Sequence, residues 1–420
     1  MTAAIRRVRA VVVTYNNASF VSATLEALAA TRWEGTLETV VVDNASVDGT
    51  ADLVARRFPN VRLLRNGTNW GFAGGANVGM GDLDGVDAVA LVNSDAGVAE
   101  DWLEPLAATL DADHSLGAAC PKILLDTPFV EVRLGAPLNR PANGDPRMLG
   151  VRVLDEDGRT QYPQGFSAAE RGGRWTNAEQ ATLWLPADAY GVMLIADRPK
   201  SAFVQGLPAD VGPESSWHAV AAAEPFDVIN NVGNELTADW YGRDRGWLQR
   251  DRGQYDEPED VWGWSGGAAL LRADYLHQVG RFDESLFMYY EDIDLAWRGR
   301  KAGWRYRFVP TSVVRHAHAA SSGGEASALF DHLNQRNRLV VLSRHAPTSV
   351  AAKAWARYTA EVGRSAWGEI ARPLLERRRP HPNTTSRRLR AGVGALRRWR
   401  RENHALGHSR ADSSRGAELE

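Results

Sequence analysis

The stretch "VRAVVVTYN" (Val8–Asn16) is a run of β-branched residues that ends in polar side chains, a pattern typical of a buried strand. A helical pattern covers residues 19–30, and a second strand-like run, "LETVVVDN" (Leu37–Asn44), follows it. Two more such runs, at 61–66 and 86–95, continue the alternation of strands and helices. Because this alternation is typical of βαβ units, the sequence predicts an α/β fold with a mixed, mostly parallel sheet and flanking helices.

Polar residues stand where these strands end. Asp43 follows the second strand, and Asn93, Ser94 and Asp95 follow the fourth. The carboxyl ends of parallel strands share one edge of the sheet, where open α/β sheets bind ligands. Asp95 by itself has two interpretations, a turn residue that bonds its own backbone or a metal ligand.

The sequence pattern changes along the chain at four points. Residues 1–125 carry the βαβ pattern, and 126–260 contain many Gly, Pro and Asp residues with short alternating runs. A compact αβ pattern resumes at 261. We therefore expect five segments: 1–125, a β-rich insertion at 126–260, 261–345, a helical basic C-terminal region at 346–402, and a disordered tail at 403–420.

Composition excludes some classes of protein. The chain has 49 Lys and Arg against 52 Asp and Glu, so no global charge favours binding to nucleic acid. Its one cysteine, Cys120, cannot form an internal disulfide. The chain contains neither a signal-peptide apolar segment nor the run of about 20 apolar residues that spans a membrane. We expect a cytoplasmic protein, with contact to the inner face of the cell membrane as an open alternative.

Two common motifs are absent. No G-x-G-x-x-G follows the first strand, which disfavours a nicotinamide enzyme. No G-x-x-x-x-G-K-[ST] occurs, which argues against a P-loop NTPase. The feature left to indicate a function is an α/β sheet with carboxylates on the edge that binds ligands.

Several blocks together resemble one family. They are "VVVTYNNASFVSATLEAL", "VVVDNASVDGT", "NWGFAGGANVG", "LVNSDAGV", "WSGGAALLRADYLHQVGRFDESLFMYYEDIDLAWRGRKAGWRYRFVP" and "VVRH". This series resembles the family 2 inverting glycosyltransferases of the GT-A fold, and within them it is most similar to bacterial rhamnosyltransferases. The resemblance covers roughly 8–125 and 261–345, and the run 264–310 is its most specific part. It implies that 1–125 is the nucleotide-sugar-binding half of the domain and 261–345 the acceptor-binding and catalytic half.

The resemblance implies a metal site for Mg²⁺ or Mn²⁺. Asp95 matches the last Asp of the family's D-x-D, so its implied role is metal ligand, whereas Asn93 stands at the first Asp. A neutral Asn lowers the negative charge of the site. His316 matches the family's late metal-binding His, in preference to His318.

The resemblance also implies roles in catalysis and binding. Asp292 would be the general base, with Glu291 either orienting the acceptor or raising the pKa of Asp292 by like-charge repulsion. Asp43 would pair with a uracil or thymine base. The other residues implied in nucleotide-sugar binding are Thr14, Tyr15, Asn69, Gly71, Phe72, Asn77, Asn93 and Ser94, and those implied in acceptor binding are Trp264, Ser265, Gly266 and Gly267. Trp264 has two open interpretations, stacking on a sugar ring and packing in the core.

These roles imply transfer of a sugar from a dTDP- or UDP-sugar, with rhamnose from dTDP-rhamnose expected. The acceptor would be a glycan or a polyprenyl-diphosphate-linked intermediate in cell-envelope polysaccharide synthesis. The alternatives are a UDP-hexose or galactofuranose transferase, a sugar nucleotidyltransferase, and a non-catalytic glycan-binding protein on the same fold. A nucleotidyltransferase should carry a basic Gly-rich loop after the first strand, which "TYNNAS" lacks.

The segment 377–401 contains ten Arg and no acidic residue. Leu389, Val393, Leu396 and Trp399 fall near one helical face, which is the pattern of a helix at a membrane surface, although two glycines weaken it. A solvated basic segment is the equal alternative. Trp399 is the one Phe, Tyr or Trp residue among these arginines, so nucleic acid is not expected as a partner.

Overall fold

The computed structural model describes residues 4–141, 145–155, 158–170, 172–221, 223–317, 328–377 and 379–416, with side chains as far as 401. The chain forms two compact units. The first comprises 1–124, 230–247 and 253–420, and the second comprises 125–229 and 248–252.

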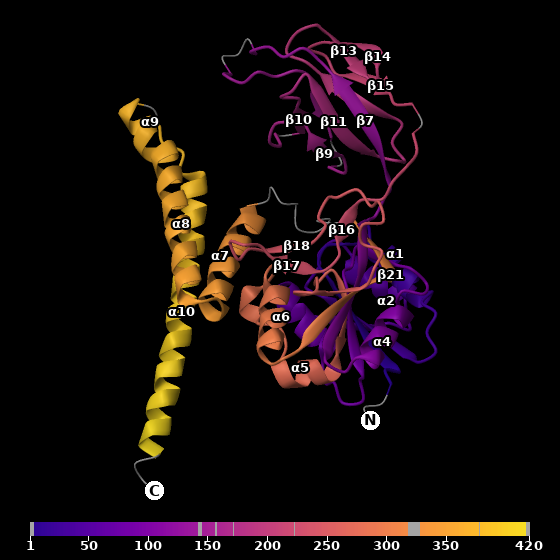
Figure 1. Ribbon diagram of the computed structural model, residues 1–420, viewed down its shortest axis with the longest axis vertical. Coiled ribbons are helices and arrows are strands. Elements are labelled where there is room, and N and C mark those ends of the chain that lie inside the picture. Colours follow the sequence, from indigo (N-terminus) through magenta and orange to yellow (C-terminus); the bar gives the residue numbers. More distant parts are fainter. Residues whose placement is uncertain are drawn as a thin grey trace. The chain divides into compact units, whose positions relative to one another are not determined.

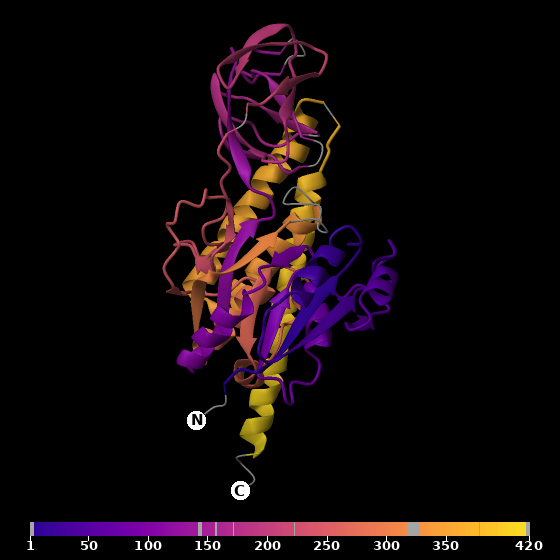
Figure 2. The same cartoon turned by 90° about the vertical axis from the view of Figure 1, so that its right-hand side faces the viewer.

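A ten-stranded sheet forms the centre of the first unit (Figure 1). Its parallel part has the order β3-β2-β1-β4, with β1 (Arg7–Thr14), β2 (Thr36–Asp43), β3 (Arg62–Arg65) and β4 (Ala88–Val92). The indigo strands at one end of the sheet in Figure 2 belong to this part. The predicted α/β fold with a mixed sheet and flanking helices is thereby confirmed.

Further strands extend this sheet beyond β4. Strand β20 (Ala268–Arg272) pairs antiparallel with β4, so that Ala268 lies opposite Val92. The order then continues through β6 (Leu116–Leu125), β21 (Arg305–His316) and β19 (Glu259–Val261). Two short strands attach at the side, β5 (Ala96–Val98) to β21 and β16 (Ile229–Asn231) to β6. The end of β4 and the start of β20 therefore lie at the same edge.

Helices cover both faces of the sheet because its strands alternate side chains between two apolar faces. On β1, Ala10 and Val12 belong to one core with α1 (Val21–Ala29) and α4 (Leu103–Ala112). Val11 and Val13 face α3 (Gly71–Met80), the Gly-rich stretch. The remaining helices of this part are α2 (Thr50–Arg57), α5 (Ala273–Val279) and α6 (Glu291–Lys301).

The second unit is built of two antiparallel sheets, as the β-rich composition predicts. One has the order β10-β8-β12-β15 and the other β14-β13-β7-β11-β9. The strands are β7 (Phe129–Gly135), β8 (Arg152–Leu154), β9 (Gln161–Gln164), β10 (Gly173–Trp175), β11 (Gln180–Pro186), β12 (Gly191–Ile195), β13 (Lys200–Val204), β14 (Leu207–Val211) and β15 (Ser216–Ala219). Alternate residues of both sheets, such as Val132, Leu183 and Leu194, form one apolar core.

Helices complete the first unit after the sheet. They are α7 (Ala328–His345), α8 (Thr348–Ala366), the π-helical turn η2 (Trp367–Ala371), α9 (Arg372–Leu375) and α10 (Asn383–Gly416). Helix α10 lies along α7 and α8 (Figure 1), and Ala391 and Ala395 are buried there. In the part of the chain that the structure describes, no helix has both the length and the hydropathy to cross a bilayer.

Two of the expected boundaries differ from the structure. The second unit ends at Ile229, with a short return at 248–252, so most of 230–260 belongs to the first unit. Short alternating strands look alike in sequence, whereas pairing decides their unit: β16 joins β6 and β19 joins β21. The tail expected to be disordered from 403 continues helix α10 as far as Gly416, and the last four residues lie outside the described ones.

The packing of α3 on β1 generates a stability prediction. A Cβ atom at Gly79 would lie 2.4 Å from Val11 Cγ1, whereas one at Gly67 would meet nothing within 4 Å. Gly79→Ala should therefore lower the free energy of unfolding by about 1–3 kcal/mol, although alanine is the better helix former. Urea denaturation checks this, with Gly67→Ala as the control. A Gly79→Ala protein as stable as the control would contradict the close packing.

Candidate functional site

Two buried oxygen atoms stand side by side at the end of β1 and β2. Thr14 and Asp43 are register partners across these strands, and their side chains are 1% and 3% exposed. Asp43 Oδ2 accepts from the Ser46 backbone N–H at 3.0 Å. Asp43 Oδ1 and Thr14 Oγ1 are both buried without a hydrogen-bond partner in the structure as described. Buried polar atoms are nearly always paired, so this pair is suited to receive a ligand's donor.

Hydrogen bonds connect the loop after β1 with the loop after β4 and the residues before β20. Asn17, which follows β1, donates to Ser94 Oγ at 2.7 Å. The Asn93 backbone N–H donates to the Gly267 carbonyl at 3.0 Å, just before β20. The loops after β1, β4 and before β20 thus form one continuous rim at the carboxyl edge of the sheet.

Asp95 and His316 meet on this rim. His316 ends β21, where its register partner is Ala96 of β5, the residue next to Asp95. His316 Nε2 lies 3.0 Å from Asp95 Oδ1 and 3.2 Å from Asn93 Nδ2. His316 Nδ1 lies 3.1 Å from Asn230 Oδ1. Since an amide oxygen only accepts, Nδ1 carries the proton, and in the neutral imidazole the lone pair is then on Nε2, the atom that faces Asp95 and Asn93.

This pair fits a divalent cation. Two adjacent ligands of an octahedral ion with bonds of about 2.1 Å lie about 3.0 Å apart, which is the separation of His316 Nε2 and Asp95 Oδ1. A neutral imidazole lone pair facing a carboxylate oxygen is satisfied when a cation lies between them. No group of three or more His, Cys, Asp or Glu side chains suited to a metal occurs among the described residues. Among the described residues, Asp95 and His316 are thus the pair placed to hold a cation, and His318 lies outside them.

Asp292 lies on the other side of the same rim, in the first turn of α6. Its Oδ2 accepts from Asn234 Nδ2 at 3.0 Å and from the Gly266 backbone N–H at 3.2 Å. Gly266 directly precedes Gly267, whose carbonyl binds Asn93. Two adjacent glycines therefore join the Asp292 carboxylate to the loop that carries Asp95.

Burial raises the pKa of both neighbouring carboxyl groups. The pKa of Asp292 is raised by burial, against the lowering effect of its hydrogen bonds from Ile293, Gly266 and Asn234. The pKa of Glu291 is raised well above its usual range by burial and then by the negative charge of Asp292. The negative charge of Asp292 thus adds to burial in raising the pKa of Glu291.

Asp294, the third acid of this run, has a structural role. It is buried, and it contacts Arg298 at 2.9 Å and His345 at 2.8 Å. Although burial opposes ionisation, the hydrogen bond from His345 and the charges of Arg298 and Arg344 lower the pKa of Asp294 to about 2. Asp294 is therefore a permanently ionised anchor between α6 and α7.

The block 69–77 is mostly used to build the site. Gly71 has a φ of +69°, and a Cβ atom there would lie 2.2 Å from the Phe287 carbonyl oxygen, so only glycine fits. Asn69 Oδ1 accepts from the Gly71 N–H at 2.8 Å. Asn77 does not have the predicted nucleotide-facing role: its amide donates to the Phe282 carbonyl at 3.0 Å and accepts from the Phe282 N–H at 3.1 Å. Phe72 packs edge to face on Phe282.

The loop 264–267 is only partly as predicted. Trp264 is fully buried and packs against Phe282, so its side chain is a core aromatic and cannot stack on a sugar. Its carbonyl accepts from Asn234 at 2.8 Å. Ser265 Oγ accepts from the Gly267 N–H at 3.2 Å and shapes the turn. Tyr15, which follows Thr14, is 38% exposed.

Asn230 and Asn234 are site residues that the sequence reasoning missed. They lie in "INNVGN" (229–234), which was assigned to the insertion, yet Asn230 binds His316 and Asn234 binds Asp292. The Asn234 backbone also pairs with Gly263 in both directions. The signal was available as three asparagines within five residues around a glycine, a density unusual for a strand.

Comparison with known proteins gives two family matches. Residues 10–141 match the model described as Glycosyl transferase family 2, and residues 216–358 match the model described as Glycosyl transferase family group 2. The chain is 26% identical over 317 residues to the N-acetylglucosaminyl-diphospho-decaprenol L-rhamnosyltransferase of Mycobacterium tuberculosis, covering 74% of this chain and 76% of that protein.

Two solved structures are similar at lower identity. One is GalNAc-T7 with UDP, GalNAc and Mn²⁺, with 13% identity, a TM-score of 0.45 and coverage of 80% of this chain, which spans about half (48%) of that one. The other is the mannosyltransferase PcManGT from Pyrobaculum calidifontis in complex with GDP-Man and Mn²⁺, with 16% identity, a TM-score of 0.42 and coverage of 93% of this chain and 87% of that one.

The raised pKa of Glu291 generates a prediction about stability. A carboxyl group whose pKa is higher in the folded than in the unfolded protein makes the folded state less stable as the pH rises above the unfolded pKa. Glu291→Gln should therefore raise the free energy of unfolding at pH 7 by about 0.5–2 kcal/mol, and this gain should shrink toward pH 4. Urea denaturation at several pH values measures it. Glu104→Gln, an exposed acid in the first turn of α4, is the control and should show no gain. A Glu291→Gln protein that is less stable at pH 7 would contradict the assignment.

Proposed function

The chain belongs to the family 2 glycosyltransferases, and we propose that it transfers a sugar from a nucleotide diphosphate donor with inversion, using Asp292 as general base. The observation that carries this proposal is the rim itself, where the Asp95–His316 pair and the Asp292 carboxylate are joined through Gly266 and Gly267. Glycosyl transfer requires a cation at the donor diphosphate and a base at the acceptor hydroxyl, on opposite sides of the transferred sugar.

In the proposed reaction the acceptor oxygen attacks C1 of the donor sugar in a single in-line displacement. The bond from C1 to the phosphate oxygen breaks, the nucleoside diphosphate leaves, and the acceptor proton passes to Asp292. The raised pKa of Asp292 suits a base that works near neutral pH. Asp95 and His316 would hold Mg²⁺ or Mn²⁺, which would neutralise the leaving diphosphate.

For the nucleotide, Asp43 Oδ1 and Thr14 Oγ1 are the buried atoms that lack partners, and both can accept a hydrogen bond. The imide N–H of a uracil or thymine is a donor of the required kind. Tyr15 would cover the base, with Asn93 and Ser94 nearer the diphosphate. We propose dTDP-rhamnose as donor, supported by the relative that is named a rhamnosyltransferase, with UDP-hexose and UDP-galactofuranose as the alternatives.

We also propose that the acceptor is a glycan on a polyprenyl diphosphate, as the name of that relative states for its own reaction. The exposed face of α10 supports work at a membrane surface. Leu389, Val393, Leu396 and Trp399 are 37–51% exposed there, whereas Ala391 and Ala395 are buried. Arginines flank these apolar side chains, as on helices that lie on anionic lipid.

Release of nucleoside diphosphate from a panel of dTDP- and UDP-sugars tests the function. Purified protein with Mg²⁺ should release the nucleotide from one donor, and EDTA should abolish the release. Asp292→Asn should lower the rate by about 10²–10⁴-fold, because the base is lost while the metal site is intact. Asp292→Asn should still be stabilised against heat by dTDP with Mn²⁺, whereas Asp95→Ala should lose that stabilisation.

The outcomes separate the candidates. A preferred UDP-hexose or UDP-galactofuranose would replace rhamnose within the same mechanism. Full activity of Asp292→Asn, or activity that EDTA leaves unchanged, would contradict the proposed roles. No release from any donor together with no nucleotide-dependent stabilisation would favour a glycan-binding protein.

Asn234 generates a prediction about pH dependence. Its hydrogen bond lowers the pKa of Asp292, so Asn234→Ala should raise that pKa. Because the base must be ionised, the acidic limb of the kcat/KM profile should move to higher pH and the rate at neutral pH should fall. Asn231→Ala removes a neighbouring buried amide that binds Asn234 and Asp244 without touching Asp292, and it should leave the limb in place. Equal shifts in both variants would assign Asn234 a structural role only.

A further inference from the structure

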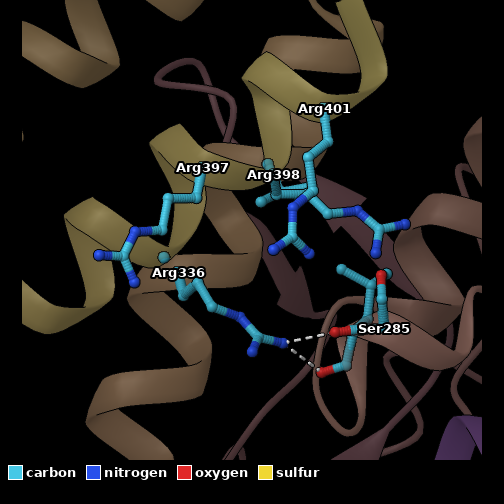
Figure 3. Close-up of a pocket in the computed structure, with 8 residues that line it drawn as sticks. Ser285, Arg336, Arg397, Arg398 and Arg401 are labelled. Atoms are coloured by element: carbon cyan, nitrogen blue, oxygen red, sulfur yellow. Dashed lines mark hydrogen bonds between the residues drawn. The ribbon is translucent and has the colours of Figure 1, made fainter. Parts of the chain in front are cut away.

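Four arginines line a pocket between α7, α10 and η1 (Glu284–Leu286), all within the first unit (Figure 3). The pocket has a volume of about 240 Å³, room for roughly eight waters at about 30 Å³ each. Its lining is Ser285, Leu286, Arg336, Val340, Gly394, Arg397, Arg398 and Arg401, with no acidic side chain among these residues.

Two of the arginines are fixed by the protein. The Arg336 guanidinium donates to the carbonyl oxygens of Ser285 at 2.8 Å and Leu286 at 2.9 Å. Arg398 donates to Asp283 Oδ2 at 3.0 Å. These bonds fix two positive charges at the pocket. A ligand would therefore not have to order these two long side chains when it binds.

The other two arginines, Arg397 and Arg401, are exposed on α10. Figure 3 shows the guanidinium groups of Arg398 and Arg401 directed toward the space above Ser285. The pocket thus combines a fixed inner pair of cations with an accessible outer pair, which is an arrangement that an entering anion can bridge.

Asp283 is a carboxylate that contacts the pocket, through Arg398. Asp283 contacts Arg398 but also binds Arg344 at 2.6 Å, so its single negative charge is shared by two arginines. Burial and the charge of Arg398 lower the pKa of Arg336, against the raising effect of Asp283. If the four arginines formed only a solvated basic surface, none of them would need to be partly buried.

The two glycines of this part of α10 have different surroundings. A Cβ atom at Gly392 would lie 2.8 Å from Tyr358 Cε1, so that glycine permits packing on α8. Gly394 lines the pocket, and a Cβ atom there would lie 3.4 Å from Arg336 Cδ. Glycine costs a helix about 1 kcal/mol relative to alanine, and at Gly394 the missing side chain leaves pocket volume open beside Arg336.

We propose that this pocket binds a phosphate-bearing anion of the size of a diphosphate. Arginine guanidinium groups recognise phosphate oxygens by paired N–H donors, and four of them around one small volume match a multiply charged oxyanion. The anion has two sources of the same chemistry, a soluble diphosphate and the phosphate group of a lipid. The proposal stands apart from the glycosyl-transfer reaction, since none of these arginines belongs to the proposed catalytic rim.

Calorimetry of the full chain with inorganic pyrophosphate in EDTA tests the proposal. The double variant Arg397→Gln/Arg401→Gln, in which both residues line the pocket, should weaken binding at least tenfold. The control Arg390→Gln/Arg400→Gln removes the same charge from exposed positions of α10 that do not line the pocket, and its affinity should stay within about twofold of the wild type. Equal weakening in both double variants, or no binding by the wild type, would overturn the proposal.

Co-sedimentation with phosphatidylcholine vesicles, with and without phosphatidylglycerol, identifies the source. Binding to anionic vesicles that falls in the pocket variant more than in the control, and that pyrophosphate displaces, supports a lipid phosphate. Equal vesicle binding by both double variants, with the calorimetric difference retained, supports a soluble diphosphate. Donor hydrolysis by the pocket variant should be unchanged, so a failure of this proposal is distinguishable from a failure of the proposed reaction.

Discussion

Two side-chain hydrogen bonds from the segment 230–234 hold the two halves of the site. Asn230 accepts from His316 Nδ1 and so orients the ring with Nε2 toward Asp95, whereas Asn234 donates to Asp292. Gly233, with a φ of +100°, makes the turn between them, and a Cβ atom there would lie 2.7 Å from Val261 Cγ1. One short segment therefore fixes both the imidazole tautomer on the proposed metal side and the carboxylate on the proposed base side.

The site stores unfavourable electrostatics and backbone strain. Asp43 Oδ1, Thr14 Oγ1 and Glu291 Oε2 are buried oxygens without partners in the described structure. Phe287, Tyr289 and Tyr290 all have positive φ immediately before the acidic pair. Such conformations cost about 1–3 kcal/mol each and persist where the surroundings determine them. Here Asn337 of α7 does so, with its amide 2.7–2.9 Å from the carbonyl oxygens of Leu286, Met288 and Tyr289.

The parts of the fold that could be predicted from the sequence are those in which apolar residues recur at a regular spacing. The β-branched runs became β1, β2 and β4, and polar strand ends placed Asp43 and Asp95 on one edge, because side-chain alternation and strand direction are local properties. The prediction that His316 lies with Asp95 required the family resemblance, since the two residues are 221 positions apart.

Other features depended on packing that the sequence does not display. The packing of α3 is one example, since Gly75 and Gly79 permit this helix to lie close on Val13 and Val11. Trp264 had equal prospects as a sugar platform and as a core residue, and only its contact with Phe282 decided between them. Asn230 was assigned to the insertion because a three-residue strand carries too little pattern to reveal which sheet it joins.

The proposed reaction depends on Asp95 and His316 holding a cation on the same rim as Asp292. Anomalous X-ray diffraction at the manganese edge, from crystals grown with Mn²⁺ and dTDP, tests this. One strong peak is expected within bonding distance of Asp95 and His316 Nε2, in contact with the nucleotide diphosphate. A peak at other side chains, or nucleotide bound at the rim with no peak beside these two residues, would contradict it.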